Sequence, residues 1–269
     1  MKMISALVLT ALLLTASASS GTPNAREVVQ ATDILSKIER GEAISVDNLI
    51  VEGDLNLSEI GLESVSDLRP GLGAGLGPRS AMGEEPEIKH PALAGGVKLI
   101  VSPISITNSV IRGNVHFDKI TFAGPVSFAG TDITGNASFA EARFANHAAF
   151  LYTQFGGDAN FKAAQFDGGV YFSGDQFGGR ADFEGAQFRQ LAGFSYAKFG
   201  DDADFKGAKF TSEAFFGGAE FRDDADFGGS EFGGYAYFGR ARFSGRSHLG
   251  EARFFEIANF YSARLDPRG

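Results

Sequence analysis

Residues 181–227 read ADFEGAQFRQLAGFSYAKFGDDADFKGAKFTSEAFFGGAEFRDDADF. In this stretch a phenylalanine returns at alternating steps of five and six residues, at positions 183, 188, 194, 199, 205, 210, 216, 221 and 227. The apolar stripe of an amphipathic helix would recur with a period of 3.6 residues. The stretch is therefore not helical, and a spacing this regular predicts a repeat architecture.

The same spacing extends in both directions, from Ile100 to Leu265, and gives 31 centre positions in unbroken alternation. Phenylalanine occupies 25 of these centres, and Phe215 and Phe255 are the only two of the 27 phenylalanines outside the series. Isoleucine or leucine occupies the other six centres: Ile100, Ile106, Ile111, Ile133, Leu249 and Leu265. Phenylalanine usage in this chain is thus a property of the repeat.

A longer period of 22 residues sets the size of the coil. The unit Ala-Asp-Phe begins at Ala181, returns at Ala203 and returns again at Ala225. Four centres fit into 22 residues, at steps of five, six, five and six, so each coil has four sides. We predict an all-β solenoid with a square cross-section, in which coils about 4.8 Å apart stack each phenylalanine on the next.

These A(D/N)F-x-x units resemble the Phe-centred branch of the pentapeptide-repeat family, and the resemblance covers about 165 of the 269 residues. It implies a right-handed quadrilateral β-helix, in which each centre and the alanine two residues before it point inward. The chain departs from the plain family pattern by the sixth residue on alternate sides.

The first 18 residues have the features of a signal peptide. Lys2 provides the positive charge, residues 4–14 provide the apolar segment, and Ala16-Ser17-Ala18 provides the cleavage site. The apolar segment is shorter than the roughly 20 residues that a bilayer-spanning helix needs. We therefore expect cleavage after Ala18, a secreted or cell-envelope product, and no membrane span after cleavage.

The remaining boundaries follow from breaks in the repeat. Residues 19–48 are expected to hold a short capping helix that starts at Thr32 and ends at Gly41. We assign residues 49–60 to the first coil, 61–99 to a Gly/Pro-rich inserted loop, 100–265 to the β-helix and 266–269 to a C-terminal tail.

Composition excludes several functional classes. The chain has no cysteine and a net charge of −9, which argues against thiolate metal sites and against nucleic acid as a partner. The four histidines lack the close spacing of metal ligands, and no nucleotide-binding or nucleophile motif occurs. We predict that the protein is not an enzyme and has no cofactor and no metal-ligating residues.

Two surface patterns remain as candidate interaction sites. The first is an acidic column, which we expect either to bind a cation or to bond the backbone N–H groups of the corners. It consists of Asp182, Asp204 and Asp226, which are 22 residues apart, with Asp202 and Asp224 beside them. The second is an aromatic set on the opposite face, which either contacts a protein or a glycan or shields the backbone. Its members are Tyr171, Tyr196, Phe215 and Tyr237.

The leading functional hypothesis is an exported structural or protein-interaction solenoid, with an unknown protein or glycan as partner. One alternative is a β-helix that binds or cleaves polysaccharide. A second alternative, implied by the family resemblance, is an acidic mimic of DNA, which export disfavours. The last coil is expected to leave strand edges and apolar rings open, which predicts an end-to-end homodimer.

Overall fold

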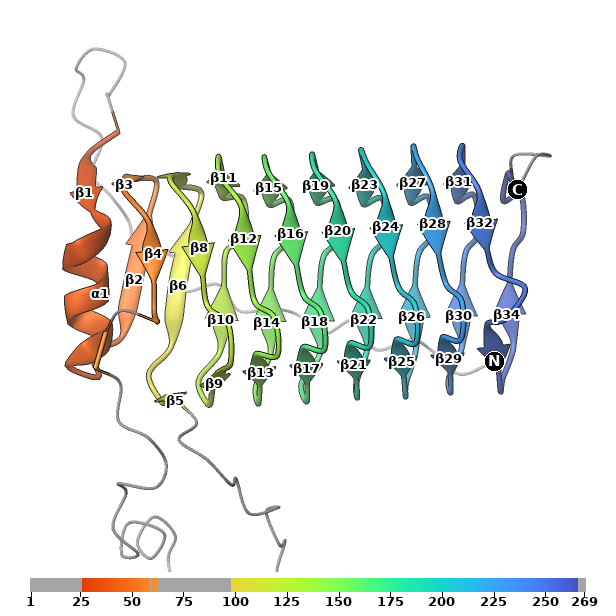
Figure 1. The fold of residues 1–269 in the computed structure, drawn as a ribbon, viewed down its shortest axis with the longest axis horizontal. Coiled ribbons are helices and arrows are strands. Elements are labelled where there is room, and N and C mark those ends of the chain that lie inside the picture. Colours follow the sequence, from red (N-terminus) through yellow and green to blue (C-terminus); the bar gives the residue numbers. More distant parts are fainter. Residues whose placement is uncertain (1–25, 59, 62–97, 266–269) are drawn as a thin grey trace, which may run out of the picture.

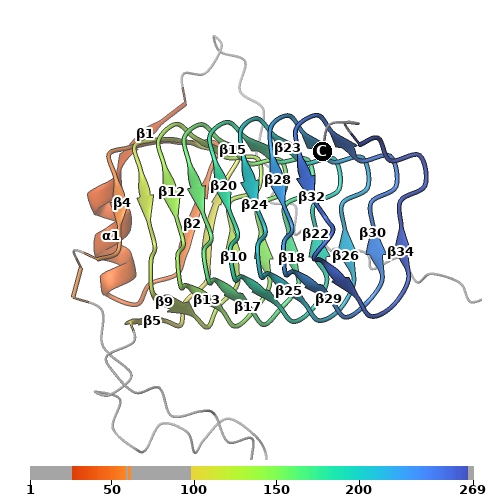
Figure 2. The same ribbon diagram turned by 45° about the vertical axis from the view of Figure 1, so that its right-hand side comes forward.

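The computed structural model describes residues 26–58, 60–61 and 98–265. They form a parallel β-solenoid whose strands line up in four sheets, one on each side of the coil (Figures 1 and 2). We name the sheets A to D, and the chain passes through them in the order B, A, C, D. Sheet B therefore lies opposite sheet C. The predicted quadrilateral solenoid with 22 residues per coil is confirmed, since paired strands are 22 residues apart.

The strands are short, and neighbours within each sheet follow one another along the solenoid axis. Sheet A contains β1 (Val28–Gln30), β3 (Ile50–Glu52), β7 (Val110–Arg112), β11 (Asp132–Ile133), β15 (Gln154–Phe155), β19 (Gln176–Phe177), β23 (Lys198–Phe199), β27 (Glu220–Phe221) and β31 (Arg242–Phe243). Sheet B contains β2 (Ile44–Asp47), β6 (Ile104–Thr107), β10 (Val126–Ser127), β14 (Ala148–Ala149), β18 (Val170–Tyr171), β22 (Ala192–Gly193), β26 (Ala214–Phe215), β30 (Ala236–Tyr237) and β34 (Ala258–Asn259). Sheet C contains β4 (Leu55–Asn56), β8 (Val115–His116), β12 (Ala137–Ser138), β16 (Ala159–Asn160), β20 (Ala181–Asp182), β24 (Ala203–Asp204), β28 (Ala225–Asp226) and β32 (Ser247–His248). Sheet D contains β5 (Lys98–Ile100), β9 (Ile120–Phe122), β13 (Arg143–Phe144), β17 (Gln165–Phe166), β21 (Gln187–Phe188), β25 (Lys209–Phe210), β29 (Glu231–Phe232) and β33 (Arg253–Phe254).

Stacked phenylalanine rings fill the interior. Phe183, Phe205 and Phe227 stack with ring centroids 4.8 Å apart and ring planes within 4° of parallel, as the repeat predicted. Rings from opposite sides meet edge to face across the interior, for example Phe172 and Phe183 at 5.3 Å. The rings are almost completely removed from water, and burying each contributes about 1.5 to 3 kcal/mol before the entropy of folding is subtracted. Stacked hydrophobic rings therefore hold the coils together.

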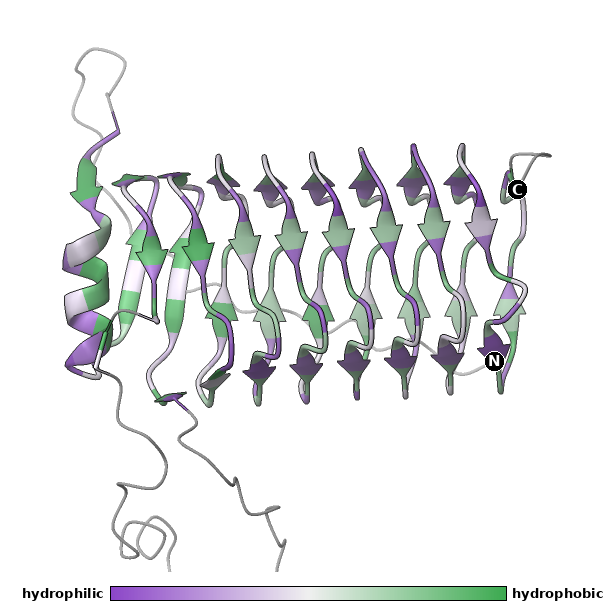
Figure 3. Cartoon of the chain, viewed as in Figure 1, coloured by the Kyte–Doolittle hydropathy of each residue, from purple (hydrophilic) through white to green (hydrophobic). Residues whose placement is uncertain are grey.

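The turns at the corners explain why the steps between successive centres alternate between five and six residues. After the centres of sheets B and C, with Leu249 as an exception among the described residues, the chain makes a tight turn in which the residue two positions after the centre has a positive φ, as at Gly130 (67°) and Gly185 (66°). The N–H of Thr131 donates to the carbonyl of Phe128 at 3.0 Å across such a turn. A positive φ at the third residue is the requirement of a type II turn, which glycine meets without steric cost. The six-residue steps follow sheets A and D. Strands of these two sheets, such as β19 and β21, carry a hydrophilic residue before their centre (Figure 3).

A helix covers the N-terminal end of the solenoid (Figure 1). Helix α1 (Ala31–Glu39) buries Ala31, Ile34, Leu35 and Ile38, and Gly41 follows it with a φ of 73°. The capping helix is thus confirmed, but its start is not at the expected Thr32. Gln30 is the N-cap residue and makes no side-chain capping bond.

The first coil begins earlier than the expected residue 49. Its centres are Val46, Val51 and Leu57, because Val46 pairs with Ile106 and Val51 pairs with Ile111. Leu55 is also buried, but it holds the position two residues before a centre. The sequence pattern was misread here because both inward positions of one short coil carry aliphatic residues.

The insertion lies inside this first coil, between β4 and β5. The Nζ of Lys98 donates to the carbonyl oxygens of Leu57, Ser58 and Ile60 at 2.9, 3.0 and 3.2 Å. The ammonium therefore fastens the two ends of the insertion together. Most of the predicted 61–99 loop, the signal peptide and the tail lie outside the described residues.

Among the residues that the structure describes, the interior holds one fully buried acid. Asp175 occupies the turn position that follows the positive-φ residue, in line with Thr131 and Thr153, which are also buried. Its Oδ1 accepts a hydrogen bond from the N–H of Thr153 at 3.0 Å, whereas its Oδ2 has no partner. Burial raises the pKa of Asp175 well above its usual range, and the backbone N–H groups offset only part of this rise.

We predict that Asp175→Thr stabilises the protein at neutral pH. Because burial raises the pKa of Asp175 in the folded state, its favourable contribution to folding is fully present below the ordinary aspartate pKa of about 3.9. This contribution is lost as the pH rises through the folded-state pKa. Removing the acid should therefore stabilise by about 2 kcal/mol at pH 7 and by much less at pH 4. Denaturant unfolding at the two pH values measures the difference. A variant less stable than the natural protein at pH 7 would contradict the prediction.

Candidate functional site

The acidic column lies on sheet C, as expected. Asp182, Asp204 and Asp226 pair with one another in register along the sheet, with Asn160 before them and His248 after them. These three aspartates are half-buried and not fully exposed, because the side chains of neighbouring coils lie against them.

The carboxylates of the column bond the backbone of their own turns. The Oδ1 atoms of Asp182, Asp204 and Asp226 accept the N–H of the residue two positions later, at 2.9, 3.0 and 2.7 Å. Asn160 accepts the N–H of Lys162 in the same way at 3.0 Å. An amide thus replaces a carboxylate at this position without loss of the bond. The geometry is the turn-bonding alternative that the sequence left open.

A second ladder runs along the corner between sheets A and C. Here the side chain of one coil accepts the N–H of the residue 22 positions later, as from Asn136 to Asp158 at 2.9 Å and from Asp158 to Arg180 at 3.0 Å. Asp224 accepts the N–H of Arg246 at 2.8 Å. Asp202 lies on this corner too, and its own N–H donates to Asp201 at 2.7 Å. Asp202 and Asp224 therefore belong to the corner and not to the column of sheet C.

Basic side chains neutralise much of this acidity. Arg180 contacts Asp204 at 2.9 Å and Asp182 at 3.6 Å, and Arg246 contacts Asp224 at 2.6 Å. The side-chain hydrogen bond from Arg246 lowers the pKa of Asp224 below its usual range. The acids and the bases that follow them thus face each other in adjacent coils.

Two groups of acids have oxygens close enough to share an ion. They are Asp182 with Glu184 and Asp204, and Asp201 with Asp202 and Asp223. Lys162 already pairs with Glu184, and Arg180 pairs with Asp204. The acids of the first group are therefore already paired with Lys162 and Arg180.

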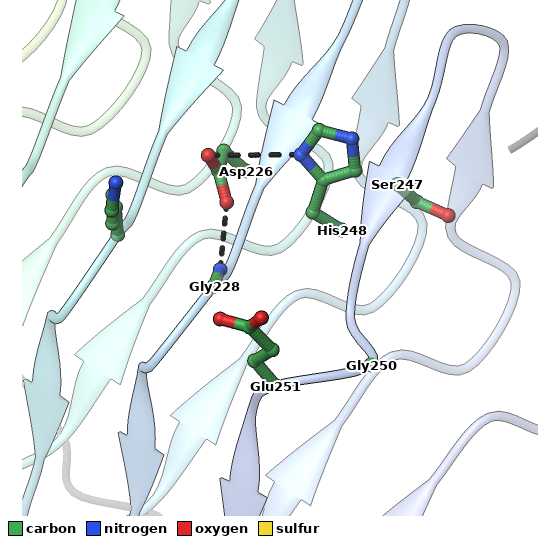
Figure 4. Close-up of a pocket in the computed structure, with 7 residues that line it drawn as sticks. Asp226, Gly228, Ser247, His248, Gly250 and Glu251 are labelled. Atoms are coloured by element: carbon green, nitrogen blue, oxygen red, sulfur yellow. Dashed lines mark hydrogen bonds and ion pairs between the residues drawn. The ribbon is translucent and has the colours of Figure 1, made fainter.

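A shallow depression of about 570 Å³ lies at the C-terminal end of this face (Figure 4). The Oδ2 of Asp226 lies 3.7 Å from the Nδ1 of His248, and Glu251 lies below this pair. The hydroxyl of Ser247 points away from the imidazole of His248. Asp226, His248 and Ser247 thus lack the serine–histidine contact that nucleophilic catalysis requires.

Sheet B carries the aromatic residues. Tyr171, Phe215 and Tyr237 share one outward column of this sheet, in register with Gly193 between the first two. Tyr196 is not in that column, because it occupies a positive-φ position at the corner between sheets B and A, with a φ of 59°. The structure therefore places the predicted set on one side of the solenoid but in two columns.

The sequence-based prediction did not include three further tyrosines that lie on this side. Tyr152 occupies the same corner column as Tyr196, and the rings of Tyr235 and Tyr237 lie 6.2 Å apart. Tyr261 follows β34. All six tyrosines of the chain, together with Phe215 and the corner residue Phe255, therefore lie on sheet B or its corners. The sequence contains a signal for this column, because tyrosine and glycine alternate every 22 residues at positions 152, 174, 196 and 218, so that tyrosine recurs after 44 residues.

The tyrosine rings rest on glycines of the next coil. A Cβ atom added to Gly174 would lie 2.5 Å from Cδ1 and Cε1 of Tyr152, and one added to Gly218 would lie 2.8 Å from the same atoms of Tyr196. Real Cβ atoms do not approach ring carbons so closely. The glycines therefore let the rings lie against the coil, while Tyr152 and Tyr196 remain 72% and 68% exposed.

Comparison with known families agrees with this geometry. The family described as pentapeptide repeats (9 copies) matches residues 106–151, 150–198 and 194–242. The chain belongs to the pentapeptide-repeat family, whose β-solenoids are generally non-catalytic. No curated protein and no solved structure matched the chain. Within the described part of the chain, no helix is long and apolar enough to cross a bilayer.

We predict that the double substitution Asp204→Asn and Asp226→Asn leaves the fold intact. The amide oxygen keeps the turn bond, as Asn160 does, and only the exposed pairs with Arg180 and His248 are lost. The melting temperature should change by no more than about 2 °C. Calcium should shift neither protein. A calcium-induced rise in the natural protein that is absent from the double variant would show that the column binds a cation.

Proposed function

We propose that this protein is an exported, non-catalytic interaction solenoid that uses the side of sheet B as its contact surface. The observation that carries the proposal is the gathering of all outward-facing aromatic residues on this one side. Aromatic side chains provide large contact areas at a small cost in conformational entropy, which favours their use in recognition. The stacked core supports this surface as a rigid scaffold.

The charged residues of sheet C support a structural role for the opposite side. Its carboxylates accept backbone N–H groups and pair with Arg180 and Arg246, which leaves few of them free to act as acid or base. The same pairing argues against the DNA-mimic alternative, because a mimic needs an unneutralised row of negative charges. Residues 1–18 support export by the features of a signal peptide.

The proposal predicts that the mature protein binds an envelope fraction of its own cells through sheet B. We expect Tyr171→Ser combined with Tyr237→Ser to weaken binding at least tenfold, whereas Gln176→Ser with Lys198→Ser on sheet A should not. Co-sedimentation of labelled protein with the fraction gives the measurement. Equal binding of the two variants would refute the assignment of the contact side. Protease treatment of the fraction separates a protein partner, which the treatment destroys, from a glycan.

We also propose that two copies associate through their C-terminal ends. Phe255, Ile257 and Tyr261 in the last coil are 67%, 72% and 71% exposed, and the rings of Phe254 and Phe260 are only partly covered. Helix α1 covers the other end, so head-to-tail chains are blocked and only a closed two-fold pair is available. Arg242, Arg246 and Arg253 pair with acids of the preceding coil, which reduces the repulsion between two basic ends.

The size of the end sets the expected affinity. A coil with a perimeter of roughly 70 Å encloses about 300 Å², well below the 800 Å² or so that each partner buries in a standard interface. We therefore expect a dimer with a dissociation constant in the micromolar range. Sedimentation velocity should show Phe255→Glu with Ile257→Glu as a monomer, and Val101→Glu near the other end as a dimer. A natural protein that stays monomeric at high concentration would disprove the association.

A further inference from the structure

From Tyr152 to Phe215 the aromatic residues of sheet B form a zigzag, with one aromatic residue per coil. Tyr152, Tyr196 and the glycines that alternate with them form the corner column, at positions 152, 174, 196 and 218. Tyr171, Gly193 and Phe215 form the strand column beside it. From Tyr152 to Phe215 the aromatic residues therefore alternate between the two columns in successive coils, and each column repeats its aromatic residue after two coils. The strand column continues with Tyr237 in the coil that follows.

The rise of the coil converts this pattern into a spacing. Stacked rings of adjacent coils on this side lie 4.8 Å apart for Phe150 and Phe172, and 4.9 Å apart for Phe172 and Phe194. Tyr152 and Tyr196, and likewise Tyr171 and Phe215, are therefore about 10 Å apart along the axis, twice the usual strand spacing. The ring of Tyr152 lies over Gly174 in the coil of Tyr171, and the ring of Tyr196 lies over Gly218 in the coil of Phe215, so the rings come in neighbouring pairs.

The surface around the rings is nearly uncharged. Apart from Arg240, the outward positions of sheet B and its positive-φ corner from Ala149 to Ser262 carry tyrosine, phenylalanine, glycine, serine, asparagine and alanine, and Glu213 is the only charged residue at the positions just before each strand. Sheet C, in contrast, carries acids and bases on most coils. Few side chains on sheet B offer hydrogen bonds that would recognise a charged or heavily substituted ligand.

We propose that this zigzag, together with its glycines, binds an extended, unsubstituted β-1,4-linked glucan that lies parallel to the solenoid axis. In such a chain each sugar is turned by half a revolution from its neighbour, so one face of the ring recurs after every disaccharide, a repeat of closely similar length to two coils. The apolar C–H face of an equatorially substituted pyranose packs on an aromatic ring. Successive disaccharides would then contact successive pairs of rings, Tyr152 with Tyr171 and Tyr196 with Phe215.

The regular spacing favours a polysaccharide over a protein as the ligand. A protein partner requires complementary shape but no fixed axial repeat. A polymer of identical units, in contrast, can contact every ring of a row whose spacing matches the repeat of the polymer. The inference rests on the proposed function, because it names the ligand of the same side of the solenoid.

The test measures binding of cellohexaose and of insoluble cellulose to the full mature chain. The probe variant is Tyr152→Gly with Tyr196→Gly, which places at these corners the residue that Gly130, Gly174 and Gly218 already provide at a positive φ. The substitution therefore relieves the backbone and does not threaten folding. The matched control is Glu141→Gly, an exposed positive-φ corner on sheet C with a φ of 57°.

We expect isothermal titration to show binding of cellohexaose that falls at least tenfold in the tyrosine variant and is unchanged in Glu141→Gly. Laminarihexaose, which is β-1,3-linked, and maltohexaose, which is α-1,4-linked, should bind at least tenfold more weakly because their repeats do not match the coil. Equal binding of the three glucans, preference for chitohexaose, or no binding of any of them would overturn the proposal. If none binds while the protease-sensitive envelope interaction persists, the contact side stands and the glucan does not.

Discussion

The fit between the coil spacing and the thickness of stacked aromatic rings is the constraint on which this structure depends. Strands that hydrogen-bond to one another repeat at about 4.8 Å, and the phenylalanine ladders follow with centroids 4.8 Å apart at Phe194 and Phe216. Each side of each coil must then provide one ring, which fixes the five and six residue steps. The interior is filled by these rings, so a ligand has access only to the outer sides and the ends.

The backbone makes further demands on the outward residues. Tight turns after sheets B and C need a residue with positive φ, and corner groups need acceptors for their N–H groups. On sheet C aspartate and asparagine meet the second demand, which explains why Asp204 and Asn160 occupy equivalent positions. On sheet B the glycines that meet the first demand also leave room for the rings of Tyr152 and Tyr196. Local backbone requirements thus separate a charged side from a neutral aromatic side.

The solenoid could be predicted because each centre repeats the same chemical choice, and errors do not accumulate over so many copies. The first coil could not, because Val46, Val51 and Leu57 are ordinary aliphatic residues in a single copy, and Leu55 is equally apolar. The acidic column was placed on the correct sheet, but its role required the distances to the backbone N–H groups. The aromatic set was predicted on one face, but the separation of Tyr196 from the strand column required the backbone of the corner, where Tyr196 follows Phe194 by two residues with a positive φ.

The buried polar column at the corner between sheets B and A shows how far the repeat tolerates exceptions. Thr153 satisfies its hydroxyl with the carbonyl of Phe128 at 2.9 Å, whereas the acid one coil later leaves Oδ2 without a partner. Alanine fills the same position at Ala197 and Ala219 and needs no partner. A solenoid in which each coil contacts only its neighbours confines such a cost to one place along the axis. The stacked rings on either side can therefore hold a locally unfavourable residue without loss of the fold.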